Sequence, residues 1–230
     1  MEKQKNIPSL RFPGFEGEWV QKEIDESFDF LSGFPFDGED ISDDLSGIPL
    51  MRGINITEGE IRHTPEIDKF YCGDISKLKK YFLKEGDLVI GMDGSKVGKN
   101  SALIVSNNAN SILVQRVARL REKEGSSLSF IYHHINSYRF HKYVDEVKTS
   151  SGIPHISATQ IKKFKIFYPD LPEQTHIASF LTAIDKKLTE LKRKKTLLEQ
   201  YKKGVMQKLF TQELRFKNDG GKEFPKWEKK

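Results

Sequence analysis

The sequence predicts a mixed α+β protein, in which a largely antiparallel or barrel-like sheet domain with helices is followed by one long coiled-coil-forming helix. Three patterns support this class: short apolar runs separated by Gly, Asn and Asp, a single helical pattern among those runs, and a heptad repeat near the C-terminal end. With 230 residues and 37% hydrophobic content, the chain is long enough to bury a core.

The sheet domain is expected over residues 18–170, after an N-terminal segment of residues 1–17. Its strands are predicted where apolar or alternating runs lie between turn residues. These runs are IPLMRGINI, GDLVIGM, SALIVSN, SILVQRVARL and KKFKIFYP. One helical stretch, from Leu128 to about Val147, interrupts them, because its aromatic and apolar residues fall on roughly one helical face.

The long helix is expected over residues 171–210. Asp170 and Glu173 have the spacing of a capping box, and Pro172 suits a first helical turn, where no amide donor is needed. Such a helix would be about 55 Å long, and its narrow apolar seam favours pairing with another helix. A helix lying on its own domain, the alternative, would show a broader apolar face. The predicted pairing residues are Ile177, Leu181, Ile184, Leu188, Leu191, Leu198, Val205 and Leu209.

The net charge of +5 is unevenly distributed. Residues 173–210 carry nine Lys/Arg and four Asp/Glu, so the basic excess lies on the helix. A nucleic-acid surface in the preceding domain must therefore be local, and the acidic segment 37–44 is expected to face away from phosphate. A single cysteine, Cys72, argues against a disulfide framework. No signal peptide or membrane-length apolar run is found, so a cytoplasmic location is expected.

A short motif near the start of the chain returns near its end. Leu10-Arg11-Phe12 followed by Trp19 reappears as Leu214-Arg215-Phe216 followed by Trp227, and the two leucines are 204 residues apart. This offset is close to the length of the domain and helix together. Residues 211–230 are therefore interpreted as the start of a truncated second repeat.

Five segments in this order resemble the specificity subunits of type I restriction-modification enzymes. They are RFPGFEGEW, LSGFPF, GDLVIGMDGSKVGKNSALI, SGIPHIS and YPDLPEQTHIASFLTAID, and the resemblance covers nearly the whole chain. Members of that family usually have two target-recognition domains, each followed by a long helix, and the two helices pack antiparallel. This sequence is similar to one such half.

The resemblance implies a non-catalytic subunit that reads one half of a split double-stranded DNA target. It also implies partner subunits, namely methyltransferase (modification) subunits and a restriction/translocase subunit. S-adenosylmethionine, ATP and Mg²⁺ would be bound by those partners, and no cofactor or metal by this chain. A second copy of the chain is expected to pair through the long helix.

Two loops are the main candidates for DNA contact. The turn that follows GDLVI offers Ser95, Lys96, Lys99 and Asn100, and its glycines permit close approach of the backbone. The loop resembling the family's second DNA-proximal loop offers Lys148, Thr149, Ser150, Ser151 and His155. Arg52, Asn55 and Arg116, near predicted strand ends, are weaker candidates, because an arginine on a strand is often salt-bridged instead.

Other functions fit the residues less well. Pro169-Asp170 and Asp185-Lys186-Lys187 match the PD…DxK sequence motif of metal-dependent nucleases. The two carboxylates of that motif must bind one cation, but on a single helix they would be about 20 Å apart. GSKVGKN lacks the spacing of a Walker A loop. Two alternatives stay open: a structural or interaction protein whose function is its coiled-coil dimerisation helix, and a regulatory or vestigial fragment of a specificity subunit.

Overall fold

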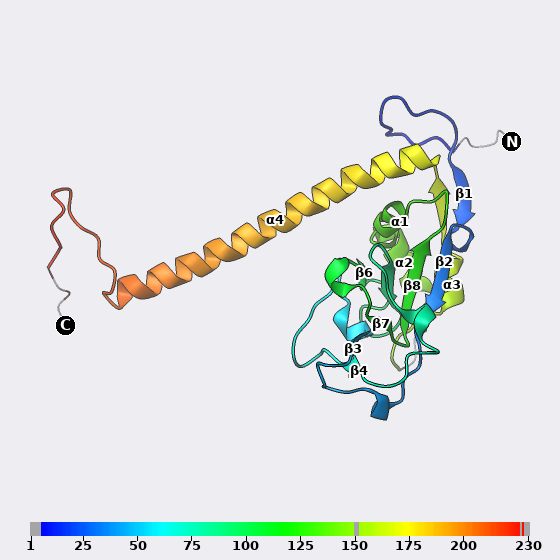
Figure 1. Cartoon of the computed structure of the whole chain (residues 1–230). Coiled ribbons are helices and arrows are strands. Elements are labelled where there is room, and N and C mark those ends of the chain that lie inside the picture. The colour runs from blue at the N-terminus through cyan, green and yellow to red at the C-terminus, as the bar shows by residue number, and fades with distance from the viewer. Residues whose placement is uncertain (1–5, 150–151, 226, 228–230) are drawn as a thin grey trace. The chain divides into compact units, whose positions relative to one another are not determined.

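A computed structural model describes residues 6–149, 152–225 and 227. Its elements follow the predicted mixture of antiparallel strands and helices with a long C-terminal helix (Figure 1). The strands are β1 Val20–Glu23, β2 Phe28–Ser32, β3 Ile48–Met51, β4 Phe70–Tyr71, β5 Leu88–Gly91, β6 Ser101–Leu103, β7 Ile112–Leu113, β8 Val117–Glu122 and β9 Lys165–Tyr168. The α-helices are α1 Leu128–Ile135, α2 Tyr138–Val147, α3 Ala158–Lys162 and α4 Leu171–Phe210.

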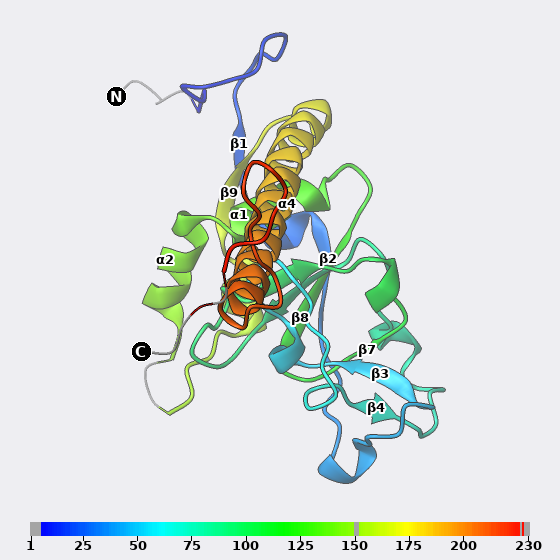
Figure 2. The same cartoon turned by 90° about the vertical axis from the view of Figure 1, so that its left-hand side faces the viewer.

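The chain divides into two compact units, residues 1–180, called the head below, and residues 181–230. Among the described residues of the head, the strands form three small sheets with the orders β1-β9, β2-β8-β5-β6 and β4-β3-β7. All named strand pairs are antiparallel except β3 with β7, and none of the sheets closes into a barrel. Figure 2 shows β3, β4 and β7 grouped together in the head.

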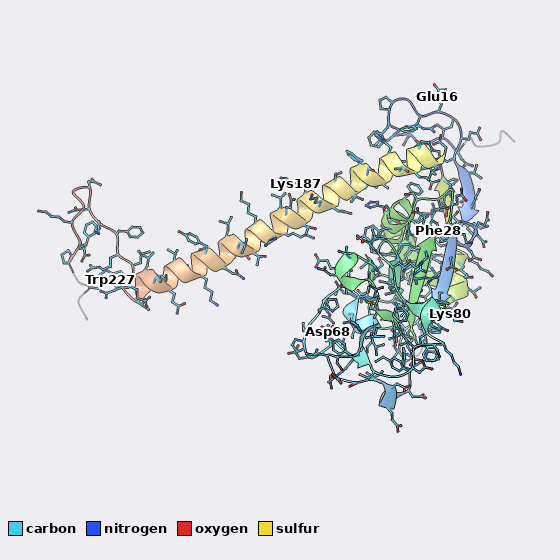
Figure 3. The ribbon with its side chains drawn as sticks, in the orientation of Figure 1. Glu16, Phe28, Asp68, Lys80, Lys187 and Trp227 are labelled. Atoms are coloured by element: carbon cyan, nitrogen blue, oxygen red, sulfur yellow. The ribbon has the colours of Figure 1, made fainter. Side chains whose placement is uncertain are left out.

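The four-stranded sheet is buried on both faces. Leu88 and Ile90 of β5 belong to a core cluster with α1 and α2, whereas Val89 belongs to a second cluster with Met51 and Val117. Successive strand residues point to opposite faces, so this continuous apolar run packs in both directions. Phe28, labelled in Figure 3, is fully buried in the first cluster.

The helix predicted from Leu128 to Val147 is in fact two helices. α1 ends at Ile135, and the hydroxyl of Ser137 accepts the N–H of Phe140, which caps the start of α2. Serine is a preferred N-cap residue, so Asn136-Ser137 interrupts an otherwise continuous helical pattern. The strand predicted over SILVQRVARL is likewise two elements, β7 and β8. Arg116 lies between them, with its backbone in the left-handed region at φ 65°.

The pH dependence of stability should include a contribution from His134, whose ring lies 4.7 Å from that of Phe130. Burial, helped by nearby Arg139, lowers the pKa of His134 from 6.5 to about 4. Between these values the unfolded chain binds more protons than the folded chain, so stability should fall as the pH decreases from 6.5 towards 4. Urea unfolding at several pH values should show a smaller acid loss for His134→Gln than for the wild type. Equal losses would contradict this assignment.

None of the described helices has the combination of length and apolar content needed to cross a bilayer.

Candidate nucleic-acid interface

An open groove of about 540 Å³ in the head is formed mainly by three distant parts of the sequence, and Ile41 adds to its lining. One wall follows β3, a second is the turn between β5 and β6, and the third is the junction of β7 and β8. The polar residues lining this groove are Arg52, Asp93, Ser95, Lys96, Asn100, Gln115 and Arg116. Five of these seven are candidates from the sequence, and they come together at one place.

A second hollow adjoins the groove, since Asp93 and Arg116 line both. Its other wall includes Ile153 and His155 of the second predicted loop. The two loops are joined through their backbones, because the N–H of Gly94 donates to the carbonyl of Pro154 at 3.0 Å. The N–H of Ile156 likewise donates to the carbonyl of Met92 at 2.9 Å. Both predicted loops therefore belong to one surface.

Arg116 lies between the two hollows. Its left-handed backbone is uncommon for a residue with a side chain, and such strain tends to occur at functional sites. The side chain is 62% exposed, and its guanidinium pairs with Asp93 at 3.1 Å. An exposed arginine held in this way presents the donor pair that reads guanine in a major groove.

The predicted lysines are all paired with carboxylates. Lys96 contacts Glu58 at 2.8 Å, while Lys99 and Lys148 contact Asp145 at 3.1 and 2.7 Å. Hydrogen bonding from Lys96 lowers the pKa of Glu58, and hydrogen bonding from Lys148 and then Lys99 lowers the pKa of Asp145. These pairs are exposed, so each holds its lysine only weakly, and a phosphate can compete for the same ammonium group.

The second loop is closed at its base by two residues. The hydroxyl of Thr149 lies 3.0 Å from Nδ1 of His155 and accepts the backbone N–H of His155 at 3.0 Å. These two candidates therefore shape the loop, and of the two only His155 lines the second hollow. Ser150 and Ser151, also candidates, lie outside the described residues.

Asn55 is placed differently from the other candidates. It is 1% exposed, and its side-chain amide donates to Asp68 at 2.9 Å and accepts the N–H of Arg52 at 3.2 Å. A buried amide with these bonds holds the turn after β3 and does not present a free edge to a base. We therefore assign it a structural role, while Arg52 itself lines the groove.

Several residues of this surface were not predicted from the sequence, among them Gln115, Asp93, the 45% exposed Ile54 and the 65% exposed Ile153. The polar pair Gln115-Arg116 interrupts the apolar run SILVQRVARL, and this interruption could have indicated that Gln115 lies at the surface. Within the described ranges, no group of three or more His, Cys, Asp or Glu side chains could hold a metal ion. The surface offers charged groups, hydrogen-bonding groups and the exposed aliphatic side chains of Ile54 and Ile153.

Close packing of the first loop depends on Gly98, which has φ +70°. A Cβ there would lie 2.8 Å from Cγ2 of Val144 in α2. Gly98→Ala should cost about 1–3 kcal/mol of unfolding free energy and displace the loop. Gly94→Ala is a matched control, because its φ is +89° but nothing lies within 4 Å of the added Cβ. Chemical denaturation should show the larger loss for Gly98→Ala, and equal losses would rule out the clash as the cause.

The seam residues of α4 differ in exposure along the helix. Ile177 packs partly against the head core, whereas Ile184, Leu188, Leu191 and Leu198 are 42–57% exposed. The remaining members, Leu181, Val205 and Leu209, are of intermediate exposure. Figure 3 draws side chains along the whole of α4, including the labelled Lys187. An isolated helix with this stripe of exposed leucines leaves apolar area that pairing would bury.

The fold of this chain, an α+β head and a 40-residue helix, is similar to that of solved S subunits of type I restriction-modification systems. The crystal structure of the M. genitalium S subunit matches with a TM-score of 0.59 and 17% identity, over 91% of this chain and 49% of that one. HsdS from Thermoanaerobacter tengcongensis matches with a TM-score of 0.57 and 18% identity, over 91% and 48% of the two chains.

Sequence comparison leads to the same family. Residues 16–200 match the type I restriction modification DNA specificity domain, and the chain belongs to this family. The EcoAI specificity subunit of Escherichia coli is 30% identical over 203 residues, which are 84% of this chain and 33% of that subunit. The MjaVIII specificity subunit of Methanocaldococcus jannaschii is 28% identical over 206 residues, 87% and 47% of the two chains. The chain thus spans a third to a half of these relatives.

Proposed function

We propose that the chain reads one half of a split double-stranded DNA target and performs no chemistry itself. The observation that carries this proposal is the gathering of Arg52, Ser95, Lys96, Asn100 and Arg116 around one groove. Arginine and the side-chain amides of Asn100 and Gln115 are the groups that form paired hydrogen bonds with guanine and adenine. Membership of the DNA specificity family supports the same reading.

Binding would exchange carboxylate partners for phosphate. Lys96, Lys99 and Lys148 would each leave an exposed ion pair for a DNA phosphate, with release of counterions from the duplex. Glu58 and Asp145 would then repel phosphates that approach in the wrong register. The lysines would position the head, and Arg116 with its neighbours would carry the base specificity.

We further propose that two copies pair through α4 in an antiparallel arrangement. The ten heptad positions comprise the eight apolar pairing residues together with Lys195 and Lys202, and their spacing permits a register in which each heptad position meets a heptad position of the other copy. This register places Ile177 opposite Leu209, Leu181 opposite Val205, Ile184 opposite Lys202, Leu188 opposite Leu198 and Leu191 opposite Lys195. The homodimer would present two identical heads and so read a palindromic split site.

In this account the methyltransferase and restriction/translocase subunits are the enzymatic partners, in the cytoplasm with their DNA. S-adenosylmethionine, ATP and Mg²⁺ would be bound by those subunits. This chain would supply target choice, and the paired helices would set the separation of the half-sites.

Binding of duplex DNA by the chain assembled with its methyltransferase subunit tests this function. Affinity should fall steeply as the salt concentration rises, because phosphate neutralisation releases counterions. It should also depend on the sequence of the duplex. If the affinity depended on neither the salt concentration nor the DNA sequence, the proposal would be wrong, and a protein-interaction role for the exposed helix would be favoured.

A further inference from the structure

The repeated Leu-Arg-Phe…Trp motif has a defined role at its first occurrence. We call residues Leu10–Trp19 the N-terminal clip. Arg11 donates from Nε and Nη2 to the two carboxylate oxygens of Glu173 at 2.8 and 2.6 Å. The same guanidinium donates to the carbonyls of Gly17 and Glu16 at 2.6 and 2.7 Å, so it joins the clip's own loop to the first turn of α4.

The receiving surface on α4 is specific. The side chain of Glu173 is 1% exposed, and a carboxylate buried in this way requires a cation as its partner. Phe12 packs edge-on against His176 and Phe180, with ring centroids 4.5 and 5.2 Å apart. The start of α4 therefore accepts one arginine and one phenylalanine from a Leu-Arg-Phe segment, and we call Glu173, His176 and Phe180 the clip site.

The second occurrence, residues 214–225 with Trp227, is called the C-terminal clip. It is also folded onto itself: Arg215 donates to the carbonyl of Pro225, and the N–H of Asn218 donates to the carbonyl of Lys222 at 2.9 Å. Among the described residues, Arg215 contacts no carboxylate, and Phe216 is 72% exposed. Figure 3 labels Glu16 in the N-terminal clip and Trp227 in the C-terminal clip.

We infer that the C-terminal clip binds the clip site of a second copy, where it alternates with that copy's own N-terminal clip. The inference rests on the proposed antiparallel pairing, which places Leu209 opposite the partner's Ile177. Arg215 and Phe216 follow Leu209 within two turns' length of chain and so reach the partner's Glu173 and Phe180. Pairing of the helices makes this contact effectively intramolecular, so it can compete with the resident clip.

Exchange of the two clips would place an arginine-carboxylate contact at each end of the helix pair. The N-terminal clip has the advantage of direct attachment to β1, and the C-terminal clip gains from the pairing of α4. Weakening the resident clip should therefore increase occupancy by the C-terminal clip.

Cross-linking between two copies that carry their single cysteine at different positions tests the inference. Both copies carry Cys72→Ser; one carries Ser179→Cys beside the clip site, and the other carries Lys217→Cys beside Phe216. A short bismaleimide can then join only one copy to the other. A band of twice the chain's mass on a denaturing gel is expected. It should strengthen when Phe12→Ala, which spares the Arg11–Glu173 pair, is added to the first copy.

Arg215→Ala in the second copy should reduce the yield roughly tenfold, as expected for loss of a charge-assisted pair. Lys222→Ala, which removes a neighbouring cation, should not. If light scattering shows a dimer but no cross-link forms, clip exchange is wrong and helix pairing stands. The same holds if a cross-link forms but its yield is unchanged by Arg215→Ala. A monomer would overturn both the pairing and the inference that rests on it.

Discussion

Replacing Leu188 and Leu198 together by aspartate is expected to convert the dimer into monomers. In the proposed register these two residues face each other across the pair, so the double variant removes four leucines from the interface. Burying a leucine contributes about 1.5–3 kcal/mol, and an unpaired buried carboxylate adds a further cost. We therefore expect the dissociation constant to rise by more than about 1,000-fold.

Sedimentation or light scattering over a range of concentrations measures this effect directly. Leu197→Asp is a matched control, because Leu197 is a 54% exposed leucine on the same helix but lies off the seam. It should leave the dimer essentially unchanged. A Leu197→Asp chain as monomeric as the double variant would show that pairing does not use the heptad seam.

Loss of specific DNA binding is expected when Arg116 is replaced by alanine. Arg116 is the exposed arginine shared by the two adjoining hollows, and a paired contact with a base contributes about 1–3 kcal/mol. Affinity for the cognate duplex should fall about 5- to 150-fold. Affinity for unrelated DNA should change much less, because phosphate contacts remain.

Two further variants separate base reading from charge. Lys96→Ala should weaken binding to all sequences and reduce the slope of log K against log salt by about one. Lys123→Ala is the control: Lys123 is exposed and directly follows β8, whereas Arg116 directly precedes it. If Arg116→Ala and Lys123→Ala lowered the affinity for the cognate duplex equally, the groove would not be the DNA-reading surface.

The sequence predicted the elements whose signal is local. The heptad and the Asp170–Glu173 spacing gave α4, and Glu173 does donate its N–H to Asp170, at 3.1 Å. The α+β class was also confirmed by the structure. The single helix over 128–147 was wrong because the capping hydroxyl of Ser137 outweighs the continuous apolar pattern.

The site was predictable only in part, because its assembly depends on contacts between distant segments. Glycines and lysines indicated the loop at Ser95–Asn100, but the backbone bond from Gly94 to Pro154 that joins it to the second loop has no local signal. Asn55 and Arg52 were both predicted to contact DNA because both lie near the end of a predicted strand. Asn55 is instead buried, and its side chain is hydrogen-bonded to Asp68. The repeated motif was visible in the sequence, whereas the role of Arg11 needed the position of Glu173.

The most direct test is a map of methylated adenines in cells that express this chain with its methyltransferase subunit. Methylation is expected at a single symmetric site made of two identical half-sites, and Arg116→Ala should abolish methylation of that site. Absence of methylation, or a site unaffected by Arg116, would contradict the claim that this groove reads DNA in a paired specificity subunit.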